Sequence, residues 1–285
     1  MHARLHLLAS TLALAVPLLT GCRPAPAAVN EVVALSAGSL PIDPGDAAWR
    51  QAPEYLAKLL PQDLVEPRLL TPSTAEIRVR ALTSGREIAL RLEWVDAAVN
   101  DTPAPGAFLD GCAIQIPRTI EASPPDPQMG QAGRPVEIAF WRADWQASVD
   151  GRPDSLTSLY PNAAIDHYPF EAKSLERGSP GQQEAATRYA PAQALANRRV
   201  GPRPQPVEDM VAEGPGTIAP ADGARSRGKG VRTANGWAVV IARPMPAGLA
   251  PNVRTAVAFA VWDGTAREAG ARKMRTIWVP LSVRG

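Results

Sequence analysis

The sequence predicts a mostly β protein, an antiparallel β-sandwich with long loops and a few short helices. Three observations favour this class. The 30 prolines and 22 glycines among 285 residues would interrupt helices too often for an α-helical fold. An apolar content of 45% is ample for a folded core. Short segments of alternating apolar and polar residues recur along the chain, and they predict strands with one buried face.

The N-terminal residues predict an export signal, which is excluded from the fold. Arg4 supplies a positive charge, and residues 7–19 form an apolar segment too short to remain as a membrane anchor. The following Leu19-Thr20-Gly21-Cys22 is similar to a bacterial lipobox, in which Cys22 becomes the acylated first residue of the mature protein. The alternative is an ordinary secretory signal that is cleaved nearby, with Cys22 incidental.

This interpretation gives the chain three parts. Residues 1–21 are a lipoprotein-type signal peptide, residues 22–30 are a tether, and residues 31–285 form one domain. We expect the protein in the periplasm, attached to a membrane only through the lipid. Cys112 would then have no disulfide partner, and its strand-like surroundings predict a small buried thiol.

The first part of the domain mixes a strand with short turns. An apolar segment over residues 31–37 predicts the first strand, and residues 44–49 predict a capped turn into a helix with Trp49 as a core anchor. Residues 56–60 predict a brief helix that ends at Pro61.

The clearest local prediction is a hairpin over residues 75–94. Ile77 and Val79 alternate with charged residues, Ser84-Gly85 turns the chain, and the alternation resumes from Ile88 to Trp94. Further strands are predicted at 112–117, 135–142, 229–233, 237–243, 254–262 and 275–283.

Residues 148–224 lack strand patterns, and they contain one predicted helix near 182–189. A segment this long in a compact domain is usually functional, so we expect it to surround a cofactor or to contact a partner. The alternative is an insertion without a role.

Charge and motif content exclude several classes of function. Lys plus Arg number 30 against 28 Asp plus Glu, so no general attraction to nucleic acid is expected. The sequence has no Gly-x-Ser-x-Gly elbow, no phosphate-binding glycine loop and no zinc pattern, and no pair of carboxylates is singled out for hydrolysis. The chain is therefore not expected to be an enzyme on its own.

Two residues in glycine-containing loops are candidate ligands of a haem iron. Met129 precedes Gly130 and a predicted strand, and Lys229 lies between Gly228 and Gly230. A thioether and a neutral amine suit haem iron better than zinc or calcium. From spacing alone, however, such a methionine usually fills a gap and such a lysine usually solvates a turn.

Several stretches in order carry a family resemblance. They are Met129-Gly130 with residues 135–145, then residues 206–218, 228–231, 235–244 and 259–264. Together they resemble the haem b-binding gamma subunit of type II DMSO-reductase-family molybdoenzymes, the group of the ethylbenzene, dimethylsulfide, selenate and chlorate systems. The matching stretches fall within residues 75–281, which is nearly the whole mature chain.

The resemblance implies a site, a cofactor and partners. The axial ligands of one haem b would be Met129 and Lys229, with Lys273 as the rival for the second position because it precedes the last predicted strand. The haem would occupy an apolar slot between the two sheets, and the protein would transfer single electrons. The implied partners are a molybdopterin-containing catalytic subunit and an iron–sulfur subunit, with a periplasmic cytochrome c as a further candidate.

The residues alone also bear on the haem type. The Cys-x-x-Cys-His attachment motif is absent, so a haem here would be non-covalent. His167 is the single histidine outside the signal segment, which excludes ligation by two histidines. Two alternatives stay open: a lipid-anchored carbohydrate-binding sandwich that uses exposed tryptophans, and an assembly factor without a cofactor. Trp141 and Trp145, four residues apart at a strand end, are candidates to line a cavity.

Overall fold

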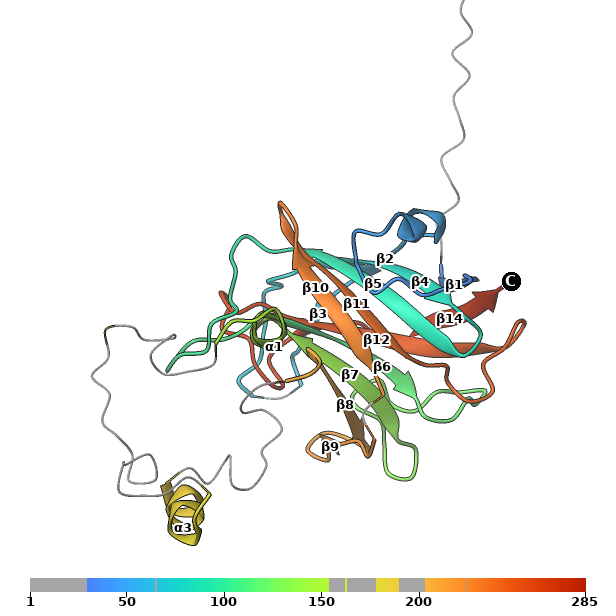
Figure 1. Ribbon diagram of the computed structural model, residues 1–285. Coiled ribbons are helices and arrows are strands. Elements are labelled where there is room, and N and C mark those ends of the chain that lie inside the picture. The colour runs from blue at the N-terminus through green and yellow to red at the C-terminus, as the bar shows by residue number, and fades with distance from the viewer. Residues whose placement is uncertain (1–29, 65, 154–161, 163–177, 190–202, 224) are drawn as a thin grey trace, which may run out of the picture.

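The computed structural model describes residues 30–64, 66–153, 162, 178–189, 203–223 and 225–285. The predicted signal peptide, Cys22 and most of the tether lie outside these residues, as do His167 and Lys173. The described chain is mostly β and sandwich-like, with few short helices, which confirms the predicted class (Figure 1).

One sheet, called sheet A, contains strands in the order β10-β11-β5-β4-β1-β14. Their bounds are β10 Arg227–Arg232, β11 Gly236–Pro244, β5 Glu87–Val95, β4 Glu76–Thr83, β1 Val32–Ser36 and β14 Val279–Arg284. All neighbours are antiparallel except β1, which runs parallel to both β4 and β14. The short strand β2 (Tyr55–Lys58) pairs with β4.

The second sheet, called sheet B, contains β12-β6-β7-β8-β9 and the short strands β13 and β3. Their bounds are β12 Arg254–Trp262, β6 Gly111–Pro117, β7 Val136–Arg142, β8 Val207–Ala212, β9 Ala219–Pro220, β13 Met274–Arg275 and β3 Leu60–Pro61. Strand β12 belongs to both sheets: residues 254–257 pair with β14, and residues 258–262 pair with β6.

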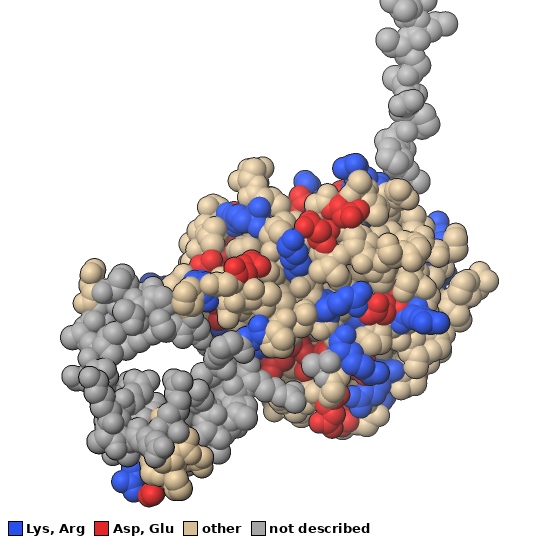
Figure 2. Space-filling view, viewed as in Figure 1, with Lys and Arg blue, Asp and Glu red and all other residues tan. Residues whose placement is uncertain are grey.

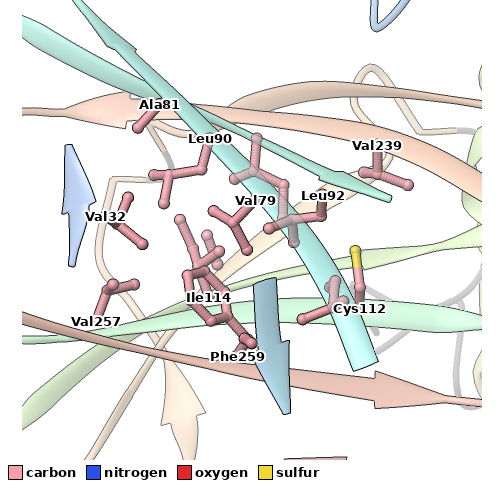
Figure 3. Packing of buried hydrophobic residues seen from close by; sticks show 14 of the residues in the cluster. Val32, Val79, Ala81, Leu90, Leu92, Cys112, Ile114, Val239, Val257 and Phe259 are labelled. Atoms are coloured by element: carbon pink, nitrogen blue, oxygen red, sulfur yellow. The ribbon is translucent and has the colours of Figure 1, made fainter. Parts of the chain in front are cut away.

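The main core lies between the two sheets. Val79, Leu90 and Leu92 of sheet A face Ile114 and Phe259 of sheet B, and all five side chains are buried (Figure 3). Cys112 lies in the same core as a free thiol, as predicted, and burial raises its pKa well above the ordinary value. The alternation in the 75–94 hairpin is confirmed, because Ile77, Val79 and Ala81 are fully buried whereas Arg78 is exposed.

Three local predictions are confirmed and three are corrected. The segment over 148–224, predicted to lack strands, contains β8 and β9 in its described part. Helix η1 (Ala47–Gln51) begins at the Asp46 cap and buries Trp49, and helix α3 (Pro180–Tyr189) lies where a helix was predicted. Strand β12 has the predicted bounds. The segment over 56–60 is wrong as a helix, since it forms β2 and β3 by pairing with β4 and β13. The predicted strand over 275–283 is two strands, β13 and β14.

Helix α1 (Ala143–Val149) follows β7 directly and was not predicted. Its buried residues include Trp145, whereas Trp141 of β7 lies in the main core between Trp94 and Trp237. Neither Trp141 nor Trp145 is among the residues that line the cavity described below.

Acidic and basic side chains are interspersed on the face shown in Figure 2. Many are paired, for example Arg80 with Glu54 at 3.0 Å and Arg91 with Glu93 at 2.7 Å. Among the described helices, none has the length and apolar content needed to cross a membrane.

Gly230 allows sheet A to lie against Trp141, which gives a direct test of the packing. A Cβ atom at position 230 would be 2.2 Å from the Trp141 ring. We expect Gly230→Ala to lower the free energy of unfolding by about 1–3 kcal/mol, because the rigid ring must shift within a packed core. Urea denaturation followed by tryptophan fluorescence measures this change. Gly38→Ala is the matched control, since nothing lies within 4 Å of its Cβ; equal effects in the two variants would contradict the packing argument.

Candidate functional site

Sheet B is apolar on both faces. Cys112, Ile114 and Ile116 of β6 face the main core, whereas Ala113 and Gln115 face the opposite side. The same alternation places Ile138 and Phe140 of β7, Met210 of β8, and Ala258, Ala260 and Trp262 of β12 on that outer side. Because alanines are frequent there, the outer face of sheet B is a flat apolar surface.

A cavity of about 690 Å³ lies on this outer face. The volume falls within the range of roughly 300–1,000 Å³ that is typical of cofactor and ligand pockets. Its walls come from five segments, the last of which includes strand β13: residues 62–64, 107–109, 127–129, 215–218 and 268–275. The predicted slot between the two sheets is therefore corrected, since the space between the sheets is filled by the core and the cavity lies outside sheet B.

Met129 lines this cavity at the side of β7 and β8. Its backbone is in the left-handed region, with φ 73°, and Gly130 follows with φ 80°. The conformation is held by hydrogen bonds: the Gly130 N–H donates to the Asp126 carbonyl at 2.9 Å, and the Gly214 N–H donates to the Met129 carbonyl at 2.8 Å. A left-handed methionine is uncommon, and such backbone strain persists where surrounding structure imposes it, often at functional sites.

Gly130 is required for this arrangement. A Cβ at position 130 would lie 3.0 Å from the Arg134 carbonyl oxygen and 3.1 Å from that of Ala212. The Met-Gly pair singled out in the sequence thus folds the chain back tightly enough to direct Met129 to the cavity.

Lys273 lines the same cavity from the opposite side. It precedes β13, in which Met274 enters the main core while Arg275 lines the cavity, so strand alternation also turns Lys273 toward the cavity. Strands β12, β6 and β7 lie between β13 and the Met129 loop in the sheet order. The two potential donors therefore approach one flat floor from its two edges.

The Lys273 amine is partly buried and has no hydrogen bond or ion pair with the described residues. Its nitrogen lies 5.3 Å from the centre of the Trp262 ring. Burial lowers the pKa of this amine from 10.5 to about 8, and the positive charge of Arg275 contributes to the same direction. A substantial neutral fraction is therefore accessible near neutral pH, and only the neutral amine can bind a metal.

Lys229 does not lie at this cavity. It is on β10, the edge strand of sheet A, and its amine forms an ion pair with Asp43 at 2.7 Å, with 40% of its side chain exposed. Gly228 and Gly230 are explained by packing instead, because Cβ atoms there would meet the Val240 carbonyl oxygen and the Trp141 ring. The structure brings Met129 together with Lys273, and the expected pairing of Met129 with Lys229 across a slot is not found.

Two arginines supply positive charge to the cavity wall. Arg142 is held by Asp144, with a nitrogen–oxygen distance of 2.6 Å. Arg275 has a looser contact, 3.9 Å from Asp63, and its Nε is buried without a hydrogen-bond partner among the described residues. Arg275 is therefore the better placed of the two to bind a carboxylate of a ligand in the cavity.

Comparison with known proteins gives the family. The model of the ethylbenzene dehydrogenase family matches residues 46–274 of the chain. The chain belongs to the ethylbenzene dehydrogenase family. The family resemblance drawn from the sequence is thereby confirmed.

Two relatives of the chain have names that state a function. A putative respiratory nitrate reductase heme subunit of Haloferax mediterranei is 28% identical over 156 residues, which span 52% of this chain and 56% of that relative. The chlorate reductase subunit gamma of Ideonella dechloratans is 24% identical over 252 residues, 85% of this chain and 79% of that protein.

Among solved structures, two complexes of a family 9 carbohydrate-binding module from Caldicellulosiruptor kristjanssonii align with the family member. The cellotriose complex has a TM-score of 0.40 and 10% identity, covering 89% of this chain and 93% of that chain. The glucose complex has a TM-score of 0.37 and 11% identity, covering 89% and 95%. Likenesses this distant say nothing about what this chain binds.

The sequence analysis did not predict the floor of the cavity, although the sequence contains a pattern that indicates it. Residues 254–262 and 111–117 are apolar almost without interruption, whereas the 75–94 hairpin alternates with charged residues. Continuous apolar strands indicate burial on both faces. In an antiparallel sheet, that pattern predicts a second covered surface, which here is the cavity.

The lowered pKa of Lys273 predicts a pH-dependent stability for the ligand-free family member. Between pH 8 and pH 10.5 the unfolded chain holds more of this proton than the folded chain, so the free energy of unfolding should rise with pH in that window. Lys273→Met cannot release the proton and should lack this rise. Urea denaturation of both proteins across the window measures the difference, and parallel pH profiles would show that the amine is not buried as described.

Proposed function

We propose that this chain is the haem-binding electron-transfer subunit of a reductase complex, with Met129 and Lys273 as the axial ligands of one non-covalent b-type haem. The observation that carries the proposal is the placement of a thioether and a readily deprotonated amine at opposite edges of one flat apolar cavity. The names of the two relatives, a heme subunit and a gamma subunit of reductases, support the same function.

The residues of the cavity fit a haem in three respects. The alanine-rich floor of sheet B offers a flat apolar surface for the macrocycle. Met129 and Lys273 could both coordinate the iron, which would leave no open position for a substrate. Arg275, whose Nε lacks a partner among the described residues, could pair with a propionate.

Such a haem would supply a ferric–ferrous couple for single electrons. The chain's own residues set the conditions for that couple. The Met129 thioether, a soft ligand, favours ferrous iron and so raises the reduction potential, and the apolar walls limit access of water. Lys273 could bind the iron only as the neutral amine. Its pKa is already lowered by the protein without a haem, so the amine can lose its proton before it binds.

The partners follow from the same proposal. A molybdopterin-containing catalytic subunit and an iron–sulfur subunit would exchange electrons with this chain, and a periplasmic cytochrome c is a further candidate. The chain would then transform no substrate itself.

Absorption spectra of the haem-loaded protein test the ligand assignment. We expect a dithionite-induced α-band in the wild type, and we expect Met129→Ala and Lys273→Ala each to shift the band or to lose the haem, because each removes one axial donor. Lys229→Ala is the matched control and should retain the wild-type spectrum, since Lys229 lies on sheet A, away from the cavity, and forms an ion pair with Asp43.

The outcomes separate the assignments. A spectrum disturbed by Lys229→Ala and unchanged by Lys273→Ala would reverse the choice of lysine. A wild-type protein that remains colourless after reconstitution with haem would remove the cofactor altogether, as the carbohydrate-binding alternative requires.

We further propose that the protein lies in the periplasm and is tethered to a membrane through acylated Cys22. The support is the Leu-x-Gly-Cys spacing at the end of an apolar export segment. Cys22→Ser should move the expressed protein from the membrane fraction to the soluble periplasmic fraction, which immunoblotting of the two fractions would show. Unchanged partition between the fractions would rule out the lipid tether.

A further inference from the structure

Three aspartates from distant parts of the chain converge at one end of the sandwich. Asp96 follows β5, Asp110 precedes β6 and Asp263 follows β12. One carboxylate oxygen from each lies within 4.8 Å of the others. Asp110 is fully buried and Asp96 is 5% exposed, so two of these carboxylates are removed from water.

The hydrogen bonds of the cluster leave oxygens unsatisfied. Asp110 accepts from the Asn100 and Gly264 N–H groups at 2.8 and 3.0 Å and from the Trp237 indole at 3.0 Å. Asp96 accepts at one oxygen from the Ala98 N–H, but its buried Oδ2 has no partner among the described residues. A bound cation would satisfy this buried oxygen and offset the repulsion among the three carboxylates.

The charge of the cluster is also unbalanced. The cation whose charge acts on Asp96 is Arg232, which donates a hydrogen bond to the Asp96 carbonyl oxygen at 2.6 Å. One arginine offsets one of three carboxylates. Burial and the charge of Asp110 raise the pKa of Asp96 to about 6, the direction expected for carboxylates that lack a counter-ion.

We propose that Asp96, Asp110 and Asp263 bind one divalent cation of the calcium type. All three side-chain ligands are hard oxygens, which select Ca²⁺ or Mg²⁺ over softer metals. Ca²⁺ tolerates an irregular set of carboxylates completed by carbonyl oxygens and water, whereas Mg²⁺ requires a near-octahedral set. The site is separate from the haem proposal and does not rest on it.

The cation would stabilise the segment that carries Lys273. Asp263 begins this segment, and its N–H donates to the buried Glu268 carboxylate at 3.0 Å while the Glu268 N–H donates back to the Asp263 carbonyl at 3.1 Å. Glu268 lies in the cavity wall, and the Trp262 indole donates to the Gly270 carbonyl at 3.1 Å. A cation at Asp263 would therefore fix the base of one wall of the cavity.

Calcium titration of the full mature chain, freed of haem and treated with a chelator, tests the proposal. Isothermal titration calorimetry should show one Ca²⁺ per chain, and the melting temperature should rise with Ca²⁺ concentration, because the cation binds only the folded state. Mg²⁺ should give a weaker response at equal concentration.

Asp96→Asn is the informative variant. Its amide oxygen can still accept the hydrogen bond from Ala98, and loss of the charge relieves repulsion from Asp110. We expect its calcium affinity to fall at least about tenfold, while its melting temperature without Ca²⁺ is no lower than that of the wild type. Asp101→Asn is the matched control, with the same change of charge in the same β5–β6 loop but outside the three carboxylates, and should keep the calcium response.

A wild type that shows neither binding heat nor a change in melting temperature up to about 10 mM Ca²⁺ would overturn the proposal. Equal calcium affinity in Asp96→Asn and the wild type would overturn it as well. If Asp96→Asn fails to fold, Asp263→Asn replaces it with the same expected loss of affinity. Because the measurements use haem-free protein, failure of the haem proposal would not affect them.

Discussion

The structure depends on one constraint: sheet B must bury apolar side chains on both of its faces. The inner face is covered by sheet A, and its large residues, such as Ile114 and Phe259, fill the main core. In the part of the chain that the structure describes, no second sheet covers the outer face, and loops around it enclose a cavity. Exposed apolar area of this size is costly in water, which makes a flat apolar ligand the natural cover for the alanines of β6 and β12.

Electrostatics distinguishes the two lysines that the sequence offered as partners of Met129. Lys229 forms an ion pair with Asp43, and its side chain is partly exposed to water. Lys273 is partly buried and has no partner carboxylate among the described residues. Its burial and the positive charge of Arg275 lower its pKa and so favour the neutral amine. The proposed role of iron ligand, which needs a neutral amine, therefore fits Lys273 better than Lys229.

The sequence predicted correctly those elements whose structure is set by the pattern of neighbouring residues. The 75–94 hairpin and β12 follow from side-chain alternation and apolar content, whereas residues 56–60 are extended because strands far along the chain pair with them. Met129 was found through the family resemblance, in which the Met-Gly pair comes shortly before a recognisable strand. The side of the sheet on which a lysine lies, and the convergence of Asp96, Asp110 and Asp263, depend on tertiary contacts that no short window of sequence contains.

The parallel placement of β1 between β4 and β14 bears on the order of assembly. Strand β14 joins β1 of sheet A to β12, which supplies part of the floor of the cavity. Contacts this far apart in sequence form late, because a long loop must first be closed. If the chain is exported as proposed, it would complete its cavity only after its C-terminal strands had crossed the membrane, and a cofactor would then be inserted in the compartment on the far side.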